Sequence, residues 1–214
     1  MKNDKGGIII VGVARGGTSL PASICHHLGI WMGKMGPRYE NPYLQWAVHA
    51  NRWDVVEKLV NEICAAKDFW GWKLPKLIDH LELIDDTLPV KGYIFVKKNI
   101  NSVARRKSKF DPNAYDINVE RIKKQYLKID EFARSRSENC LILDYENIMD
   151  NLELAVNKIA ELNNIKLFNV KEVIAGVLKD AEDYKVSEYH STQRTSLHKR
   201  LSKIIDDNDV KRPN

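Results

Sequence analysis

Short runs of consecutive apolar residues alternate along this chain with segments in which apolar residues recur every three or four positions. A continuous apolar run of about four to eight residues is typical of a strand buried on both faces of a parallel sheet. Such runs lie at residues 7–13, 69–73, 92–97 and 140–144. The periodic segments predict amphipathic helices over residues 19–28, 53–65, 74–86, 101–109, 117–136, 152–163 and 170–178.

Strands that alternate with helices predict an α/β fold with right-handed crossovers. We expect a three-layer sandwich in which helices flank a central, mostly parallel sheet of about four to five strands. Ligands of such sheets bind beyond the carboxyl ends of the strands. Candidate chemistry is therefore sought where each apolar run ends.

The composition is that of an ordinary globular protein, with 43% hydrophobic and 29% charged residues in 214. This length fits a single domain, residues 1–214, better than two domains. The longest apolar run is far shorter than the roughly 20 residues that a membrane-spanning helix needs. The first residues also lack the apolar stretch of a signal peptide, so the sequence predicts a cytoplasmic protein without a membrane span.

Charge changes this picture mainly through its distribution. The balance of 34 Lys and Arg against 29 Asp and Glu gives +5, which suits an anionic ligand but is too small to indicate nucleic acid. No spacing typical of metal ligands is present. Residues 97–109 hold six bases and no acid, namely Lys97, Lys98, Arg105, Arg106, Lys107 and Lys109. This run is interpreted as an anion site, with a solvated helix face as the alternative.

The segment that follows the first apolar run has the features of a phosphate-binding loop. Residues 12–19 read GVARGGTS and lie between a predicted strand and a predicted helix. Glycines let successive N–H groups turn inward, and the helix N-terminus adds partial positive charge. Arg15 supplies a fork of donors, and Thr18 and Ser19 supply hydroxyl groups. The alternative is a glycine turn without a ligand.

This loop is close to the P-loop pattern G-x-x-x-x-G-K-[ST], but Thr18 occupies the position of the lysine. Nucleotide kinases use that lysine on the β- and γ-phosphates. Its absence argues against metal-dependent phosphoryl transfer. A P-loop kinase or NTPase is kept as an alternative, because Asp144 and Glu146 at a strand end could imitate the acid that holds Mg²⁺, although a structural role is favoured for both.

The loop resembles the 5'-phosphosulfate loop of the sulfotransferase family, G-x-P-[RK]-[SG]-G-T-[ST]. The matching residues are Gly12, Arg15, Gly16, Gly17, Thr18 and Ser19, with Ala14 in place of the proline. Further segments resemble the family in the same order, at residues 39–45, 72–75, 93–106 and 141–165. The resemblance covers residues 8–165. Residues 166–214 form a predicted helical extension, whose polar stretch 189–200 is interpreted as a lid or as a frayed basic end.

The resemblance implies a P-loop-containing enzyme that uses 3'-phosphoadenosine 5'-phosphosulfate (PAPS) and releases 3',5'-adenosine bisphosphate. It implies transfer of a sulfuryl group to a hydroxyl or amine by in-line displacement without a metal ion. The expected partner is a small-molecule or glycan acceptor, and no nucleic acid. A non-catalytic nucleotide-binding relative is the remaining alternative, because the second phosphate site departs from the family pattern.

The resemblance also implies residue roles in transfer. Arg15 and Lys73 correspond to cations at the transferring group, and Glu40 corresponds to the base that deprotonates the acceptor. Alternative interpretations are a surface lysine at a strand end and an acidic cap for a helix that begins near residue 42. Rival bases are His26, His27 and His49, for which a packing or solvent role is favoured.

Cofactor contacts are implied for the loop residues Arg15, Gly16, Gly17, Thr18 and Ser19 and for three later residues. In the element that holds the 3'-phosphate, Lys98 occupies the family's arginine position, Ile100 replaces a proline and Arg106 replaces a serine. Tyr145 is placed near the adenine, and a core tyrosine is the alternative.

Overall fold

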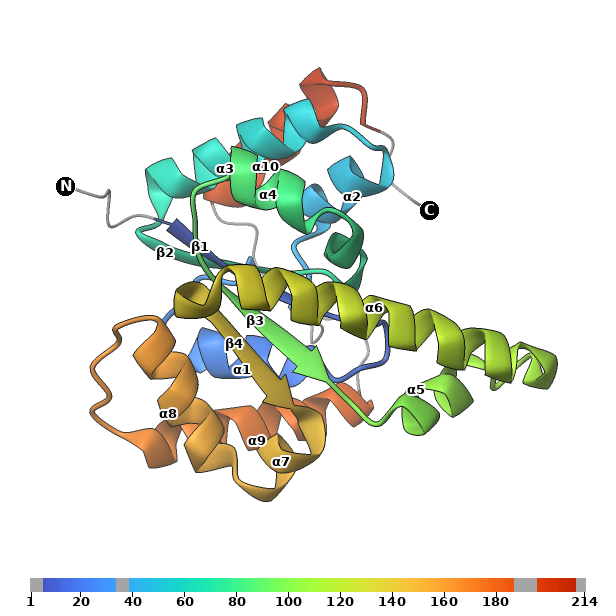
Figure 1. Ribbon diagram of the computed structural model, residues 1–214. Helices are drawn as coiled ribbons and strands as arrows, with labels where there is room; N and C mark the ends of the chain where they lie inside the picture. The colour runs from blue at the N-terminus through green and yellow to red at the C-terminus, as the bar shows by residue number, and fades with distance from the viewer. Residues whose placement is uncertain (1–5, 34–38, 187–195, 211–214) are drawn as a thin grey trace.

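A central sheet of four parallel strands organises the computed structural model, which describes residues 6–33, 39–186 and 196–210. The strands are β1 (Gly6–Gly12), β2 (Phe69–Lys73), β3 (Val90–Lys97) and β4 (Cys140–Asp144), in the spatial order β2-β1-β3-β4. Each strand falls within two residues of an apolar run. The predicted α/β fold is confirmed (Figure 1).

Helices cover both faces of the sheet, as Figure 1 shows. One face packs against α2 (Pro42–His49), α3 (Trp53–Ala66), α4 (Leu81–Thr87), α6 (Tyr115–Ser135) and α10 (Ser196–Asp207). The other packs against α1 (Ser19–His27), α7 (Tyr145–Asp150), α8 (Leu152–Leu162) and α9 (Val170–Val186). Alternation along β1 serves both cores, because Ile9 and Val11 face the first group while Ile8 and Ile10 face the second.

The predicted helix over residues 74–86 is wrong as a single element. A 3₁₀ helix, Pro75–Asp79, is followed by α4, and His80 between them has a non-helical conformation with φ −131°. Pro75 begins the 3₁₀ helix after an extended Leu74, as expected for a residue before proline. The apolar periodicity continues across the break, because Leu77, Ile78, Leu81 and Ile84 all remain buried.

The C-terminal extension contributes to the core. Helix α10 buries Leu197, Leu201 and Ile205 against α2 and α3. Residues 189–195, the other part of the stretch interpreted as a lid or a frayed end, lie outside the described residues. Within the described ranges, no helix combines the length and apolar composition that crossing a bilayer requires.

We expect Ile9→Ala to destabilise the fold by about 2–5 kcal/mol, because it opens a cavity at a position that is 0% exposed between the two helical layers. Ile142→Ala on the edge strand β4, where the side chain is 43% exposed, should stay within about 1 kcal/mol of wild type. Urea unfolding of both variants measures the difference. Equal losses would contradict this layered core.

Candidate phosphate-binding and transfer site

The parallel sheet brings the predicted site segments to one edge. Register pairs place Ile10 beside Lys73, Gly12 beside Val96, and Lys97 beside Asp144. The carboxyl ends of all four strands therefore lie on the same side. The phosphate-binding loop follows β1, and Lys73, Lys98 and Tyr145 end or follow the other strands there.

The loop between β1 and α1 contains two residues with positive φ, Arg15 at 72° and Gly17 at 87°. A non-glycine residue in the left-handed region stores backbone strain, which is often found at functional sites. The Gly16 N–H donates to the Val13 carbonyl at 2.8 Å, so this predicted cofactor donor is used inside the loop. Over the described residues, the N–H groups of Gly17, Thr18 and Ser19 have no backbone acceptor, which leaves them for an anion.

Tyr145 packs directly on this loop. A Cβ atom at Gly17 would lie 2.1 Å from Cδ2 of the Tyr145 ring, so the ring covers the glycine at a distance that no other residue type permits. The Lys98 Nζ lies 3.8 Å from the centre of the same ring, on the scale of a cation–π contact. The aromatic ring thus connects the loop to the first cation of the second predicted site.

Lys98 and Arg106 form a pair of like charges. Burial lowers the pKa of Lys98, and the nearby Arg106 guanidinium lowers the same pKa further, while Glu146 acts in the opposite direction. Arg106 lies on α5 (Ile100–Lys107) and is exposed. Two neighbouring cations favour an anion bound near both, because its charge relieves their repulsion.

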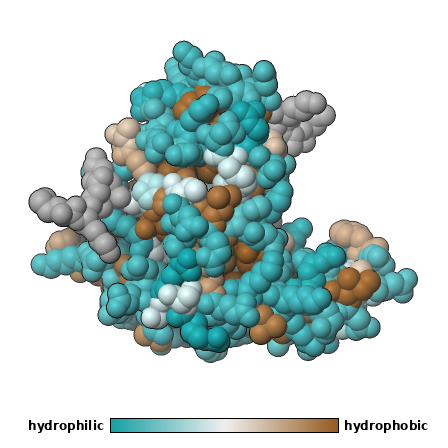
Figure 2. All heavy atoms as spheres, turned by 45° about the horizontal axis from the view of Figure 1, so that its top comes forward, coloured by the Kyte–Doolittle hydropathy of each residue, from teal (hydrophilic) through white to brown (hydrophobic). Residues whose placement is uncertain are grey.

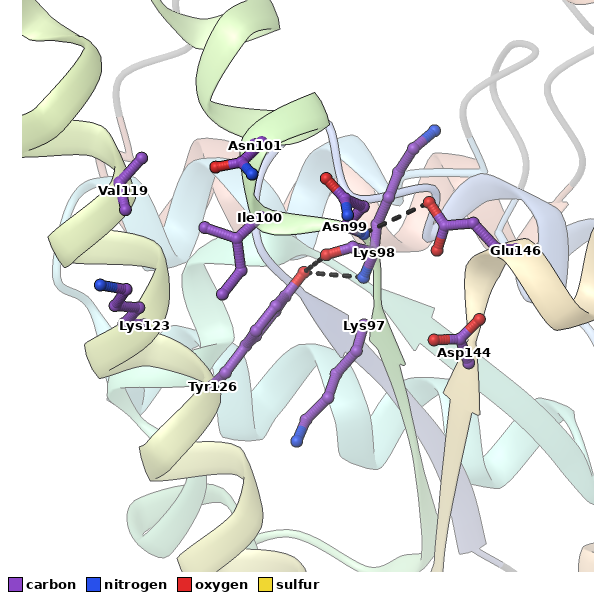
Figure 3. Close-up of a pocket in the computed structure, with 10 residues that line it drawn as sticks. All are labelled: Lys97, Lys98, Asn99, Ile100, Asn101, Val119, Lys123, Tyr126, Asp144 and Glu146. Atoms are coloured by element: carbon purple, nitrogen blue, oxygen red, sulfur yellow. Dashed lines mark hydrogen bonds between the residues drawn. The ribbon is translucent and has the colours of Figure 1, made fainter.

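The run of bases at residues 97–109 does not act as one cluster. Lys97 and Lys98 point to opposite sides of β3, as Figure 3 shows. Lys97 forms an ion pair with Asp130 and approaches the Tyr126 ring. Of the six bases, the structure therefore brings only Lys98 and Arg106 together near the loop.

An open cleft of about 690 Å³ lies between α5, α6 and α7 at the ends of β3 and β4 (Figure 3). Tyr126 from α6 lines it, and its hydroxyl lies 2.7 Å from both the N–H and the carbonyl oxygen of Lys98. This residue fixes the backbone of Lys98. Sequence analysis missed Tyr126 because its spacing with Ile122 and Ile129 is that of an ordinary core position.

The two acids at the end of β4 have structural partners. Asp144 caps α7 by accepting the Asn147 N–H at 2.9 Å, and Glu146 accepts the Asn99 N–H at 3.3 Å. The described part of the chain contains no group of three His, Cys, Asp or Glu side chains placed to hold a metal ion. These hydrogen bonds give both acids a structural role.

Glu40 and Lys73 form an ion pair with 2.7 Å between Oε1 and Nζ. The Lys73 side chain is 4% exposed and that of Glu40 is 21% exposed, so Lys73 is not a surface lysine. The cap of α2 is Asn41, which accepts the N–H groups of Tyr43 and Leu44 at 3.1 and 3.4 Å. Glu40 is therefore not the helix cap, and the structure joins Lys73, which the resemblance placed at the transferring group, to Glu40, which it placed at the acceptor.

Asp180 from α9 anchors the residue before Glu40. The Tyr39 hydroxyl and the Ser23 hydroxyl both donate to the Asp180 carboxylate, the latter at 2.6 Å, and His27 Nε2 lies 3.0 Å from it. Burial, and then the bond to Asp180, raise the pKa of Tyr39. His27 therefore contacts Asp180, whereas Glu40 forms its ion pair with Lys73. Sequence analysis missed Asp180, which no local motif marks.

The other two rival bases, His26 and His49, have different surroundings. The His26 ring packs against His27 and Tyr39, with ring centres 5.1 and 5.3 Å apart. His49 is exposed at the last residue of α2. Glu40 is the candidate base that contacts Lys73.

Comparison with solved structures shows similar folds in sulfotransferases. The sulfotransferase domain of the Synechococcus PCC 7002 olefin synthase matches with a TM-score of 0.62 and 12% identity, covering 100% of this chain and 98% of that one. The sulfotransferase domain from the curacin biosynthetic pathway matches with a TM-score of 0.58 and 13% identity, covering 98% and 99%. The chain thus has the sulfotransferase fold. No protein-family model and no curated protein matches its sequence.

We expect Gly17→Ala to abolish stabilisation by 3',5'-adenosine bisphosphate, because the added Cβ displaces the Tyr145 ring from the loop. Gly29→Ala is a matched control, since Gly29 has the same φ of 87° but open space around the added Cβ. Both variants carry a backbone cost of about 1–2 kcal/mol, so both should melt at lower temperature. Thermal melting with and without the bisphosphate distinguishes them. A retained ligand shift in Gly17→Ala would contradict this role of the loop.

Proposed function

We propose that this chain, which has the sulfotransferase fold, transfers a sulfuryl group from PAPS to a hydroxyl or amine of an acceptor. The observation that carries the proposal is that the loop and Lys98 both contact the ring of Tyr145. The loop offers free N–H groups and Arg15, and the ring of Tyr145 separates them from Lys98 and Arg106. PAPS has a matching order of groups, a 5'-phosphosulfate, an adenosine and a 3'-phosphate.

The residues of the loop would hold the 5'-phosphosulfate. Its bound form supplies the sulfuryl group and a phosphate leaving group. Preorganised N–H donors at Gly17, Thr18 and Ser19 would stabilise the charge that develops on the leaving oxygen, which is usually the largest catalytic contribution. Arg15 is exposed at the same loop and provides a bidentate partner for an anionic group.

The Glu40–Lys73 pair would act at the acceptor. The Glu40 carboxylate can accept the acceptor proton at an oxygen, as a general base does. The buried Lys73 ammonium, 2.7 Å from that carboxylate, holds it in place and supplies positive charge for the transferring group. Asp180 orders the segment that carries Glu40 through Tyr39.

A kinase or NTPase is the weaker candidate. Thr18 replaces the lysine of the P-loop, and Asp144 is occupied as the cap of α7. A relative that binds the nucleotide without transfer would share the loop and the Lys98–Arg106 pair. Such a relative would not catalyse transfer at the Glu40–Lys73 pair, and the turnover assay with Glu40→Gln measures this difference.

The nucleotide preference tests the proposed cofactor. We expect 3',5'-adenosine bisphosphate to raise the melting temperature more than ATP with Mg²⁺, since a ligand at 100 times its dissociation constant adds about 2.7 kcal/mol. Lys98→Ala and Arg106→Ala should each lower the affinity for the bisphosphate by about tenfold or more, because a charge-assisted hydrogen bond contributes about 1.5–3 kcal/mol. The affinity for 5'-AMP, which lacks the 3'-phosphate, should not change. Arg105→Ala, one residue away and exposed, is the control. An equal response to ATP and the bisphosphate would refute the 3'-phosphate site.

The role of Glu40 is tested by Glu40→Gln. This change keeps the shape of the side chain but removes the proton acceptor, so we expect turnover to fall by about 100-fold or more. Affinity for the bisphosphate should remain that of wild type. Release of the bisphosphate from PAPS, measured with phenol, sugar and amine acceptors, provides the assay. Glu57→Gln on the exposed face of α3 is the control, and normal turnover in Glu40→Gln would assign the proton transfer to another group.

A further inference from the structure

Helices α5 and α6, with the segment that connects them, form a projection that extends beyond the sheet (Figure 1). We call residues 97–136 the basic arm. They contain twelve Lys and Arg and five Asp and Glu, a net charge of +7, whereas the whole chain carries +5. The other residues together therefore carry −2. The positive charge of this protein is thus concentrated in the projection formed by α5 and α6, together with Lys97 and Lys98 at the end of β3 and Arg136 after α6.

Part of this charge is not used inside the protein. Lys97, Lys123, Lys128 and Arg136 form ion pairs, and the proposed cofactor site uses Lys98 and Arg106. In the described structure, five further exposed cations of the arm have no ion-pair partner. Arg134 lies near the end of α6, and the other four, Arg105, Lys109, Arg121 and Lys124, lie nearer the connection between α5 and α6. These four side chains are available to an external anion.

The acids on the arm do not cancel these cations. Asp111 accepts the Asn113 N–H, and Glu120 pairs with Lys123. Asp130 pairs with Lys97. Asp116 and Glu131 are exposed on α6. Against these five exposed cations without an ion pair, three exposed acids without one remain, namely Asp111, Asp116 and Glu131, so the surface of the arm is net positive.

The end of the arm also exposes large apolar side chains. Phe110, in the connection between α5 and α6, is 91% exposed, and Ile117, in the first turns of α6, is 62% exposed. Lys109 Nζ lies 5.5 Å from the centre of the Phe110 ring. Figure 2 shows hydrophobic atoms at the end of the projecting part, surrounded by hydrophilic ones. Neither apolar side chain contributes to the buried core.

The apolar and basic positions of α6 share one face. Ile117, Arg121 and Lys124 are spaced by four and three residues, which places them in one stripe along the helix. The opposite positions Ile122 and Ile129 are buried against the body. This exposed face of α6 thus carries an apolar side chain at its start and two cations without an ion pair further along, and exposed apolar and basic side chains together suit an anionic lipid surface.

We infer that the basic arm docks on an anionic lipid surface. Phe110 and Ile117 enter the boundary between headgroups and acyl chains, and Arg105, Lys109, Arg121 and Lys124 contact the anionic headgroups. Lipid is favoured over RNA, because a base could stack on the Phe110 ring but the aliphatic Ile117 would remain in water, whereas a lipid surface accommodates both side chains. The inference does not depend on the proposed enzymatic activity.

The test measures sedimentation of the full chain with vesicles of phosphatidylcholine, with or without phosphatidylserine. We expect binding that requires phosphatidylserine and weakens with salt, as headgroup attraction does. The double variant Phe110→Ser, Ile117→Ser should bind at least about fivefold more weakly, and Arg121→Glu, Lys124→Glu should bind at least about tenfold more weakly. All four positions are exposed, so thermal melting should remain that of wild type.

Phe168→Ser provides a matched control. Phe168 is 89% exposed and lies beside Lys166, whose Nζ is 5.7 Å from its ring centre, yet it lies outside the basic arm. This variant should bind vesicles like wild type. The inference is overturned if phosphatidylserine vesicles do not bind, or if Phe168→Ser reduces binding as much as the arm variant. It is also overturned if RNA binds more tightly than vesicles and Phe110→Ser, Ile117→Ser leaves vesicle binding unchanged.

The same variants separate this inference from the proposed function. Their melting shift with 3',5'-adenosine bisphosphate should match wild type, because none of the four residues contacts the loop or Tyr145 in the described structure. Loss of vesicle binding in these variants, together with a normal melting shift with the bisphosphate, supports lipid docking by the basic arm and says nothing against the proposed function. If the wild-type protein binds vesicles but shows no melting shift with the bisphosphate, the proposed function is refuted and the lipid docking is not.

Discussion

The parallel direction of the four strands is the constraint on which the candidate site depends. Every strand delivers its carboxyl end to the same edge, so residues far apart in the sequence meet there: the loop after β1, Lys73 at the end of β2, Lys98 after β3 and Tyr145 after β4. An antiparallel neighbour would carry one of these groups to the opposite edge. The apolar side chains on both faces of β1 favour this parallel arrangement. Parallel sheets are covered by helices on both faces, and such a sheet buries the apolar side chains of both faces of the strand.

Two contacts then turn this shared edge into a defined site. The Tyr145 ring lies on Gly17, and the absence of a side chain there sets the spacing between the loop and the Lys98 side. On the β2 side, Asp180 holds Tyr39, whose φ of 55° is a strained conformation for a bulky residue. The next residue is Glu40, and its carboxylate reaches Lys73. Helix α9 thereby stabilises residues 39–40, which lie far from it in the sequence. The hydrogen bond to Asp180 offsets the backbone strain at Tyr39.

The sequence predicts local features of this structure more reliably than long-range ones. Four apolar runs identified all four strands, and GVARGGTS identified the loop between β1 and α1. The break at His80 was missed because the buried face continues through it. Asp180 and Tyr126 could not be assigned, since their partners come from other elements and only the packed fold brings them together. The opposite directions of Lys97 and Lys98 follow from the two-residue period of a strand and could have been derived from it.

The basic run at residues 97–109 shows how geometry divides one sequence feature among several environments. At the end of β3, strand alternation sends Lys97 toward α6, where Asp130 neutralises it, and sends Lys98 toward Tyr145. Helical periodicity begins at residue 100 and brings Arg106 back to Lys98, while Arg105 and Lys109 stay exposed. A net-charge count over the sequence gives each of these cations the same weight. Their neighbours differ, however, and a cation beside a carboxylate, a cation beside another cation and a cation in water attract an external anion to very different degrees.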